Sequence, residues 1–140
     1  MKKIIVYTDG GSRNNPGIAG IGVFITDEKG KVLKKAKKFL GIQTNNWAEY
    51  EGVIFALETL KQMFGSKTKD LDIELRLDSQ LVERQLNGIY KIKEPSLFEQ
   101  FVRVNNLKVV GFPNIKFIHI PRKENGEADK LANEAMDEGK

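Results

Sequence analysis

The 140-residue chain contains no cysteine, one histidine and four prolines. Without cysteine the protein cannot form disulfide bonds or thiolate metal sites, although this absence does not identify a cellular compartment. No apolar run approaches the roughly 20 residues that a membrane-spanning helix needs. The apolar stretch at residues 4–7 is too short for the core of a signal peptide. We therefore expect a cytoplasmic protein without a membrane partner.

The charged residues are unevenly distributed along the chain. The formal net charge of +4 mildly favours a polyanionic partner such as nucleic acid. Lysines gather within residues 29–38 and recur at Lys91 and Lys93, whereas acids occupy the candidate site described below. The lysines of residues 29–38 also suit an edge strand that must not pair with a second molecule, and we favour this interpretation.

Apolar periodicity predicts a single domain over residues 1–140 with the element order βββαβααβα. A chain of this length can bury one core. Three antiparallel strands, followed by strands that are reached through helices, imply an α/β fold with a mixed sheet flanked by helices. The predicted strands are residues 4–7, 20–26, 31–40, 71–77 and 115–120, and the predicted helices are residues 46–64, 79–86, 95–107 and 125–136.

Four carboxylates stand at the end of a predicted strand or near the start of a predicted helix, namely Asp9, Glu49, Asp78 and Asp129. Each has a structural explanation when it is considered alone. Asp9 suits a turn, and Asp78 could help to cap the helix that follows it. Glu49 and Asp129 lie where a helix dipole favours acids. A close group of acids is electrostatically costly, however, and divalent cations, which prefer oxygen ligands, relieve the repulsion.

Each acid lies in a short motif, and the motifs follow one another in a characteristic order. They are Tyr-Thr-Asp-Gly-Gly-Ser at residues 7–12, Asn-Pro-Gly at 15–17, Thr-Asn-Asn-Trp-Ala-Glu at 44–49, Asp-Ser-Gln at 78–80 and Asn-Gly-Glu-Ala-Asp-Lys-Leu-Ala at 125–132. Together they resemble type 1 ribonuclease H, a nuclease that cuts the RNA strand of an RNA–DNA hybrid. The resemblance covers nearly the whole chain. It implies a ribonuclease H-like fold, whose five-stranded sheet has three antiparallel strands and then two parallel ones.

The resemblance implies that Asp9, Glu49, Asp78 and Asp129 are catalytic and bind two Mg²⁺ ions, with Mn²⁺ as an alternative. In such an enzyme one ion activates water for in-line attack and the other stabilises the departing 3′-oxygen. The products would carry 5′-phosphate and 3′-hydroxyl ends. The expected partner is an RNA–DNA hybrid, and no protein partner is implied.

The resemblance also provides candidate substrate contacts, which are Asn15, Thr44, Asn46 and Gln80. Family members use the matching Asn and Gln side chains in the minor groove of the hybrid, where amides can donate to and accept from 2′-hydroxyl groups. Thr44 resembles a threonine that holds a phosphate. Asn15 also suits a turn and Asn46 a helix N-cap, and both structural roles are compatible with substrate binding.

The loop before the last acid departs from the family pattern. Many members carry a histidine there, but residues 121–124 contain Arg122 and Lys123 and no histidine. These two cations are auxiliary candidates, although neither can shuttle a proton near neutral pH as histidine does. The only histidine, His119, falls within the last predicted strand, where we favour a structural role.

Two further departures concern the grip on the substrate. The segment after residues 78–80 is short, so the basic protrusion of some members is absent. Ile42 stands where some members place an arginine for phosphate. Lys91 and Lys93 are candidates for substitute contacts to the nucleic-acid backbone.

Two alternative functions are compatible with the same fold. One is a non-catalytic hybrid-binding module, because a fold does not by itself determine function. Retention of all four acids argues against it, since a pure binder gains nothing from negative charge beside phosphate. The other is a DNA-junction nuclease or an integrase-type enzyme, which the Asn-Pro-Gly, Thr-Asn-Asn and Asp-Ser-Gln contexts fit less well. The endoribonuclease is the leading hypothesis.

Overall fold

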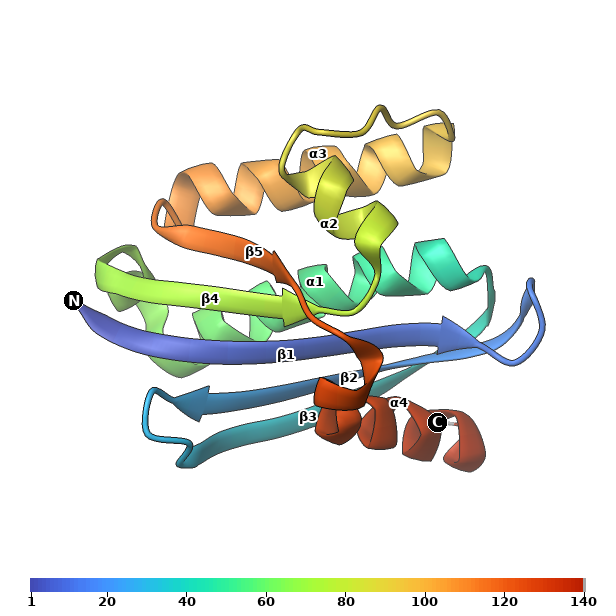
Figure 1. The fold of residues 1–140 in the computed structure, drawn as a ribbon, viewed down its shortest axis with the longest axis horizontal. Coiled ribbons are helices and arrows are strands. Elements are labelled where there is room, and N and C mark those ends of the chain that lie inside the picture. Colours follow the sequence, from blue (N-terminus) through green and yellow to red (C-terminus); the bar gives the residue numbers. More distant parts are fainter. Residues whose placement is uncertain (140) are drawn as a thin grey trace.

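Residues 1–139, the part of the chain that the computed structural model describes, form a five-stranded mixed sheet with helices on both faces (Figure 1). Its strands are β1 (Lys2–Ser12), β2 (Gly17–Asp27), β3 (Val32–Gln43), β4 (Leu71–Leu77) and β5 (Ile115–His119). The strand order is β3-β2-β1-β4-β5. β1, β2 and β3 pair antiparallel, whereas β4 is parallel to both β1 and β5. The predicted fold class is confirmed, and the lysine-rich strand β3 lies at an edge as expected.

The helices cover the two faces of this sheet unequally. Within residues 1–139 they are α1 (Asn45–Phe64), α2 (Gln80–Leu86), α3 (Pro95–Gly111) and α4 (Gly126–Glu138). α1 packs on β1 and β2 and is contacted by α3, whereas α4 packs on β2 and β3 from the other face (Figure 1). The sequence did not predict the short 3₁₀ helices at Gly65–Asp70 and Arg122–Glu124, and α3 continues beyond residue 107. None of these helices has both the length and the apolar character needed to cross a membrane.

The main core lies between the sheet and α1. β4 alternates strictly between buried and half-buried residues, as its sequence predicts. Val53, Ala56 and Leu60, which helical spacing places on one face of α1, are fully buried. Full burial of a side chain such as Leu60 contributes about 1.5–3 kcal/mol. This packing fixes the position of α1 against β1 and β2.

Two glycines allow helices to approach the sheet closely from opposite faces. A Cβ atom on Gly10 would lie 2.2 Å from the Ala48 carbonyl oxygen of α1. A Cβ atom on Gly22 would lie 2.2 Å from the Ala128 carbonyl oxygen of α4. Because Asp9 precedes Gly10 and pairs with Gly22, both helices are held close to the strand position that carries this acid.

The N-terminus of α1 is capped two residues earlier than one interpretation of the sequence implied. The side chain of Thr44 accepts a hydrogen bond from the Trp47 backbone nitrogen at 3.2 Å. Asn46 is therefore a residue of the first helical turn, and its interpretation as an N-cap is wrong. Thr44 takes the role because its hydroxyl group precedes the first helical residue and can accept from the third one.

Candidate active site

Asp9 and Asp78 come together where the parallel pairing between β1 and β4 ends. The last paired residues are Thr8 and Leu77, so each acid occupies the next position along the chain. Beyond this point β1 continues beside β2 to Ser12. In α/β sheets the carboxyl ends of parallel strands, at a point where the topology changes, commonly bind ligands. The register of two strands thus creates the first half of the site.

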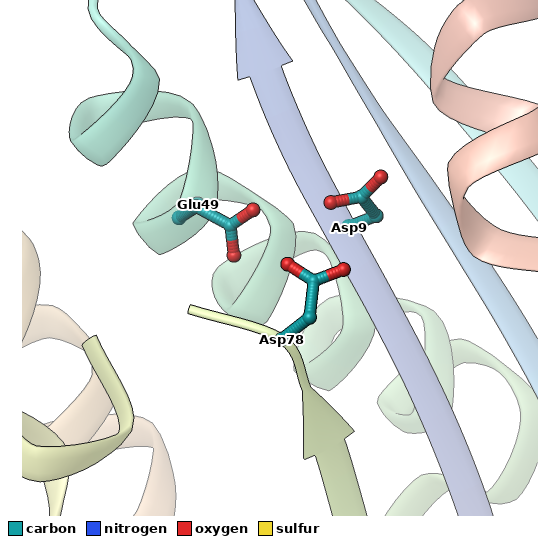
Figure 2. A group of neighbouring side chains, drawn as sticks. All are labelled: Asp9, Glu49 and Asp78. Atoms are coloured by element: carbon teal, nitrogen blue, oxygen red, sulfur yellow. The ribbon is translucent and has the colours of Figure 1, made fainter. Parts of the chain in front are cut away.

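Glu49 reaches the same point from α1. Glu49 is 6% exposed, and its Oε1 atom accepts a hydrogen bond from the Gly10 backbone nitrogen at 3.1 Å. Oε2 is buried and has no hydrogen-bond partner within residues 1–139. One carboxylate oxygen from each of Asp9, Glu49 and Asp78 lies within 4.8 Å of the others. Figure 2 shows the three side chains converging from β1, α1 and the end of β4.

Asp129 lies on α4 and lines the cleft into which the other three acids project. Within residues 1–139 it does not belong to the group whose oxygens lie within 4.8 Å of one another. The structure therefore brings three of the predicted acids into a tight group and places the fourth on the wall of their cleft.

The electrostatic environment of the cluster favours protonated acids when no cation is bound. Burial raises the pKa of Asp9 to about 8, and the nearby charge of Asp78 adds to the effect. Burial also raises the pKa of Glu49 well above its usual range, with the charges of Asp9 and Asp78 contributing. Both effects have the same origin, because a charged carboxylate is disfavoured by lost hydration and by like charge.

These residues fit a hard divalent cation. The donors are carboxylate oxygens, which Mg²⁺ and Mn²⁺ prefer. The orphaned oxygen of Glu49 is buried beside the other two acids, where a cation would satisfy it. A positive charge would also reverse the shifts in pKa, since metal binding releases protons from its ligands. Asp9, Glu49 and Asp78 are therefore candidate metal ligands.

A hydrogen-bonded network joins the β1–β2 turn to the start of α1. The Asn45 side-chain oxygen accepts from the Ser12 backbone nitrogen at 2.8 Å and from its hydroxyl group at 3.1 Å. The Asn15 side-chain oxygen accepts from the Asn45 backbone nitrogen at 3.0 Å. Ser12, Asn45 and Asn46 line the acidic cleft. The network therefore attaches one predicted substrate contact, Asn15, to the start of α1, where the other, Asn46, lines the cleft.

The other predicted substrate contacts flank the cleft. Thr44 precedes Asn45 and caps α1, and Gln80 is exposed at the first position of α2, directly after Ser79. Asn45 and Ser79 both line the cleft. Thr44 and Gln80 thus lie at its edges, on the sides of α1 and α2 respectively.

The auxiliary candidates fall into two places. Arg122 lines the acidic cleft, and Lys123 is exposed beside it in the 3₁₀ helix that precedes α4. Lys91 and Lys93 line a separate groove in the segment between α2 and α3. His119 is the last residue of β5, as its predicted strand position implies, and it is exposed; the structural role favoured for it stays a prediction.

Asn125 occupies the N-cap position of α4, but its side chain forms no capping hydrogen bond and contacts other elements instead. The amide nitrogen donates to the Thr8 carbonyl oxygen at 2.8 Å and to Asp78 Oδ2 at 3.0 Å. The residue is 1% exposed, and α4 has no side-chain cap. Asn125 therefore ties the start of α4 to β1 and to one acid of the cluster. No local pattern could have indicated this contact, because its partners are far away in the sequence.

Comparisons with known proteins agree with this architecture. A family model described as "Reverse transcriptase-like" matches residues 7–135. The chain is 42% identical to Ribonuclease HI of Halobacterium salinarum over 97% of its own length, but it spans less than two thirds of that relative, 65%. It is 36% identical to Ribonuclease H of Ruthia magnifica, and the match covers 98% of this chain and 97% of the relative.

A solved structure gives the same result in three dimensions. LC11-RNase H1, isolated from compost by a metagenomic approach, superposes with a TM-score of 0.94 at 54% identity and covers 99% of both chains. A second structure of that protein contains an RNA/DNA hybrid and superposes equally well, at 53% identity, over 97% of this chain and 98% of the other. Because the family model matches most of the chain, and relatives that it spans almost entirely are ribonucleases H, the chain belongs to the type 1 ribonuclease H family.

Proposed function

We propose that this protein is an endoribonuclease that hydrolyses the RNA strand of RNA–DNA hybrids and leaves 5′-phosphate and 3′-hydroxyl ends. The observation that carries the proposal is the convergence of Asp9, Glu49 and Asp78 at one end of the sheet. The hybrid bound to LC11-RNase H1 supports the same substrate class here. Residues 1–140 would form a single catalytic domain, and the cytoplasm is the proposed location of this activity.

The proposed ligands of two divalent cations, Mg²⁺ or Mn²⁺, are Asp9, Glu49, Asp78 and Asp129. When bound, such ions supply an activated water and stabilise the charge on the departing 3′-oxygen. The contribution of the chain is to hold these acids on separate, closely packed elements, with Glu49 fixed by the Gly10 backbone and Asp78 by Asn125. Fixed positions matter because carboxylates that could move apart would relieve their repulsion without a cation.

The proposed substrate contacts use polar groups that the fold leaves available. The Asn15 oxygen is engaged by the Asn45 backbone, so its amide nitrogen is the group that donates to the hybrid. The Thr44 hydroxyl oxygen accepts from Trp47, and its proton is the group that donates to a phosphate. Asn46 and Gln80 would contact the minor groove, where amides recognise 2′-hydroxyl groups.

The cations have separate proposed roles. Arg122 lines the cleft and would neutralise a phosphate next to the acids, with Lys123 as a weaker contributor beside it. Lys91 and Lys93 would contact the backbone of the hybrid at a distance from the reacting bond. Such contacts orient a nucleic acid without reading its sequence.

The proposal is tested with labelled RNA–DNA hybrid, RNA duplex and DNA duplex, each incubated with Mg²⁺, Mn²⁺ or EDTA. We expect cleavage of the RNA strand of the hybrid with either metal and none with EDTA. Binding of the hybrid without cleavage in any metal would instead identify a non-catalytic module. Cleavage of DNA substrates in preference to the hybrid would identify a DNA nuclease of the same fold.

A further inference from the structure

One row of polar side chains on α4 faces the acidic cleft. Asp129, Asn133 and Asp137 are spaced four residues apart, so they lie on the same side of the helix. Asp129 and Asn133 line the cleft. A different side of the helix, which includes Ala128, Ala132 and Ala135, is buried against the sheet.

Arg13, in the turn between β1 and β2, binds two members of this row. Its Nη2 atom lies 2.7 Å from Asp137 Oδ1. The same nitrogen lies 3.3 Å from both the carbonyl oxygen and the side-chain oxygen of Asn133. Arg13 itself lines the acidic cleft. The turn that follows the strand carrying Asp9 is therefore attached to the helix that carries Asp129.

Asn133 extends the connection to the acid. While its side-chain oxygen accepts from Arg13, its side-chain nitrogen donates to the Asp129 carbonyl oxygen at 3.0 Å. An unbroken path of hydrogen bonds thus runs from Arg13 through Asn133 to the backbone of Asp129. Groups that orient metal ligands in this way influence metal affinity without touching the metal.

We propose that Arg13 is a positioning residue, which holds the cleft-facing row of α4 in register so that Asp129 lies within reach of cations bound by Asp9, Glu49 and Asp78. The inference rests on the proposed metal site. It goes beyond the family motifs, which provide the acids but say nothing of residue 13. All of these contacts are made by one guanidinium nitrogen, Nη2, so the ammonium group of lysine, a point charge on a flexible stem, should replace them only in part.

The structure also provides a matched control on the other side of the same helix. Lys37 of β3 forms ion pairs with Glu134 and Glu138 of α4. These acids are also four residues apart, but on a side of the helix that does not line the acidic cleft. Lys37→Ala therefore removes an ionic attachment of α4 to the sheet, as Arg13→Ala does, without interrupting the path to Asp129.

The experiment compares Arg13→Ala, Arg13→Lys and Lys37→Ala with the parent protein. Calorimetric titration with Mn²⁺ measures metal affinity without any reaction, and thermal melting in EDTA reports the fold. We expect Arg13→Ala to raise the Kd for Mn²⁺ about 3-fold, which is less than the roughly 10- to 100-fold effect of partners bound directly to a ligand side chain, because the path ends at the backbone of Asp129. The Kd of Arg13→Lys should lie between those of the parent protein and of Arg13→Ala, and Lys37→Ala should leave the Kd unchanged.

Hybrid cleavage provides the second readout. We expect Arg13→Ala to lower kcat at limiting Mn²⁺, to recover at high Mn²⁺ and to keep the parent KM for the hybrid. A raised KM with unchanged Mn²⁺ affinity would overturn the proposal and show that Arg13 contacts substrate phosphate. A lower melting temperature with unchanged Kd and kcat would also overturn it, in favour of a purely structural role.

Failure of the proposed function gives a different result. If the parent protein binds Mn²⁺ but does not cleave the hybrid, the endoribonuclease assignment falls, while the calorimetric comparison still tests Arg13. If the parent protein does not bind Mn²⁺, both the metal site and the positioning role are overturned.

Discussion

At the scale of single residues, Glu49 and Asp9 show how the fold places carboxyl groups where water hydrates them poorly. Glu49 is almost completely buried, with one oxygen bound to the Gly10 backbone and the other unpartnered within residues 1–139. The pKa of Asp9 is raised to about 8 by burial and by Asp78. In the absence of a cation these residues oppose folding, because their ionised forms are disfavoured. The proposed cation ligands and a source of instability are thus the same atoms.

The change Asp9→Asn should abolish most hybrid cleavage and leave the fold intact. It removes a metal-binding charge but keeps the shape of the side chain, so the metal-free melting temperature should stay the same or rise as repulsion falls. Cleavage with Mg²⁺ and melting in EDTA measure the two effects. The exposed Asp70, in the 3₁₀ helix before β4, provides the control Asp70→Asn, which should retain activity. Full activity of Asp9→Asn would refute its assignment as a metal ligand.

The stability of the metal-free protein should decrease as the pH rises. The pKa of Asp9 is about 8 in the folded protein but close to its usual value of 3.8 in the unfolded chain. Between these values the folded state binds the extra proton, so stability that is present below about pH 4 is lost as the pH approaches about 8. Melting in EDTA across this range should show the decrease, and Asp9→Asn should make it shallower. Equal slopes for both proteins would contradict the shift in pKa.

Adding Mn²⁺ should reverse this pH dependence. Cation binding requires ionised carboxylates and displaces their protons, so Mn²⁺ should stabilise the protein more at high pH than at low pH. Melting temperatures with Mn²⁺ and with EDTA, compared at each pH, measure the difference. A stabilisation by Mn²⁺ that did not change with pH would mean that the cation binds elsewhere.

At the scale of elements, the site depends on the distance between α4 and β2. The Ala128 carbonyl oxygen approaches Gly22 so closely that no side chain fits. Asp129 follows Ala128 directly, and Gly22 pairs with Asp9 in the sheet. The same contact therefore determines how far the acid on α4 stands from the acid on β1.

The change Gly22→Ala should destabilise the protein and lower cleavage together. Overpacking of this kind typically costs about 1–3 kcal/mol, because the helix must move away from the strand. The matched control is Gly126→Ala at the start of α4, where an added Cβ atom meets nothing within 4 Å. It should change stability by less than about 0.5 kcal/mol. Urea unfolding measures both, and unchanged stability of Gly22→Ala would mean that α4 can relax at no cost.

At the scale of the whole molecule, the cluster of acids and two groups of lysines occupy different places. The acidic cleft lies at one end of the sheet, while Lys91 and Lys93 line a groove between α2 and α3. The exposed lysines of β3 form an edge of the sheet. This separation suits the proposed function, in which one molecule attracts a polyanion and binds cations next to its phosphates.

Amide contacts and lysine contacts should respond differently to salt. Single changes of Asn15, Asn46 or Gln80 to Ala should weaken hybrid binding by about 0.5–1.5 kcal/mol, roughly 2- to 13-fold, and reduce the preference for hybrid over DNA duplex. Changes of Lys91 or Lys93 to Ala should keep the preference but make the salt dependence shallower, because phosphate contacts act through counterion release. Each change is combined with Asp9→Asn to prevent cleavage. The affinity of these proteins for hybrid and for DNA duplex, measured across salt concentrations, separates the two groups.

The control for these variants is Lys67→Ala, an exposed lysine in the 3₁₀ helix before β4. It should change neither the salt slope nor the preference. If all three amides could be truncated without changing the preference for hybrid, readout of the minor groove by these residues would have to be abandoned. Discrimination would then depend on the shape of the hybrid or on metal placement alone.

Features that depend on neighbours in the chain could be predicted from the sequence. The alternation in β4 and the apolar face of α1 follow from periodicity, and the acids were found because each sits in a recognisable motif. Element ends were less certain, because several residues can cap one helix. Thr44 rather than Asn46 caps α1, since only the hydroxyl group before the first turn meets the free backbone nitrogens.

By itself, therefore, the sequence determined the order of the elements, the edge position of β3 and the identity of the acids, since these follow from local pattern and from motif. Only the tertiary structure decided how the acids meet. Asp9 and Asp78 adjoin because the parallel pairing ends at Thr8 and Leu77. The Asn125 side chain donates to Asp78 and forms no capping hydrogen bond with α4. Such contacts join residues far apart in the chain, and only strand order, register and close helix packing bring them together.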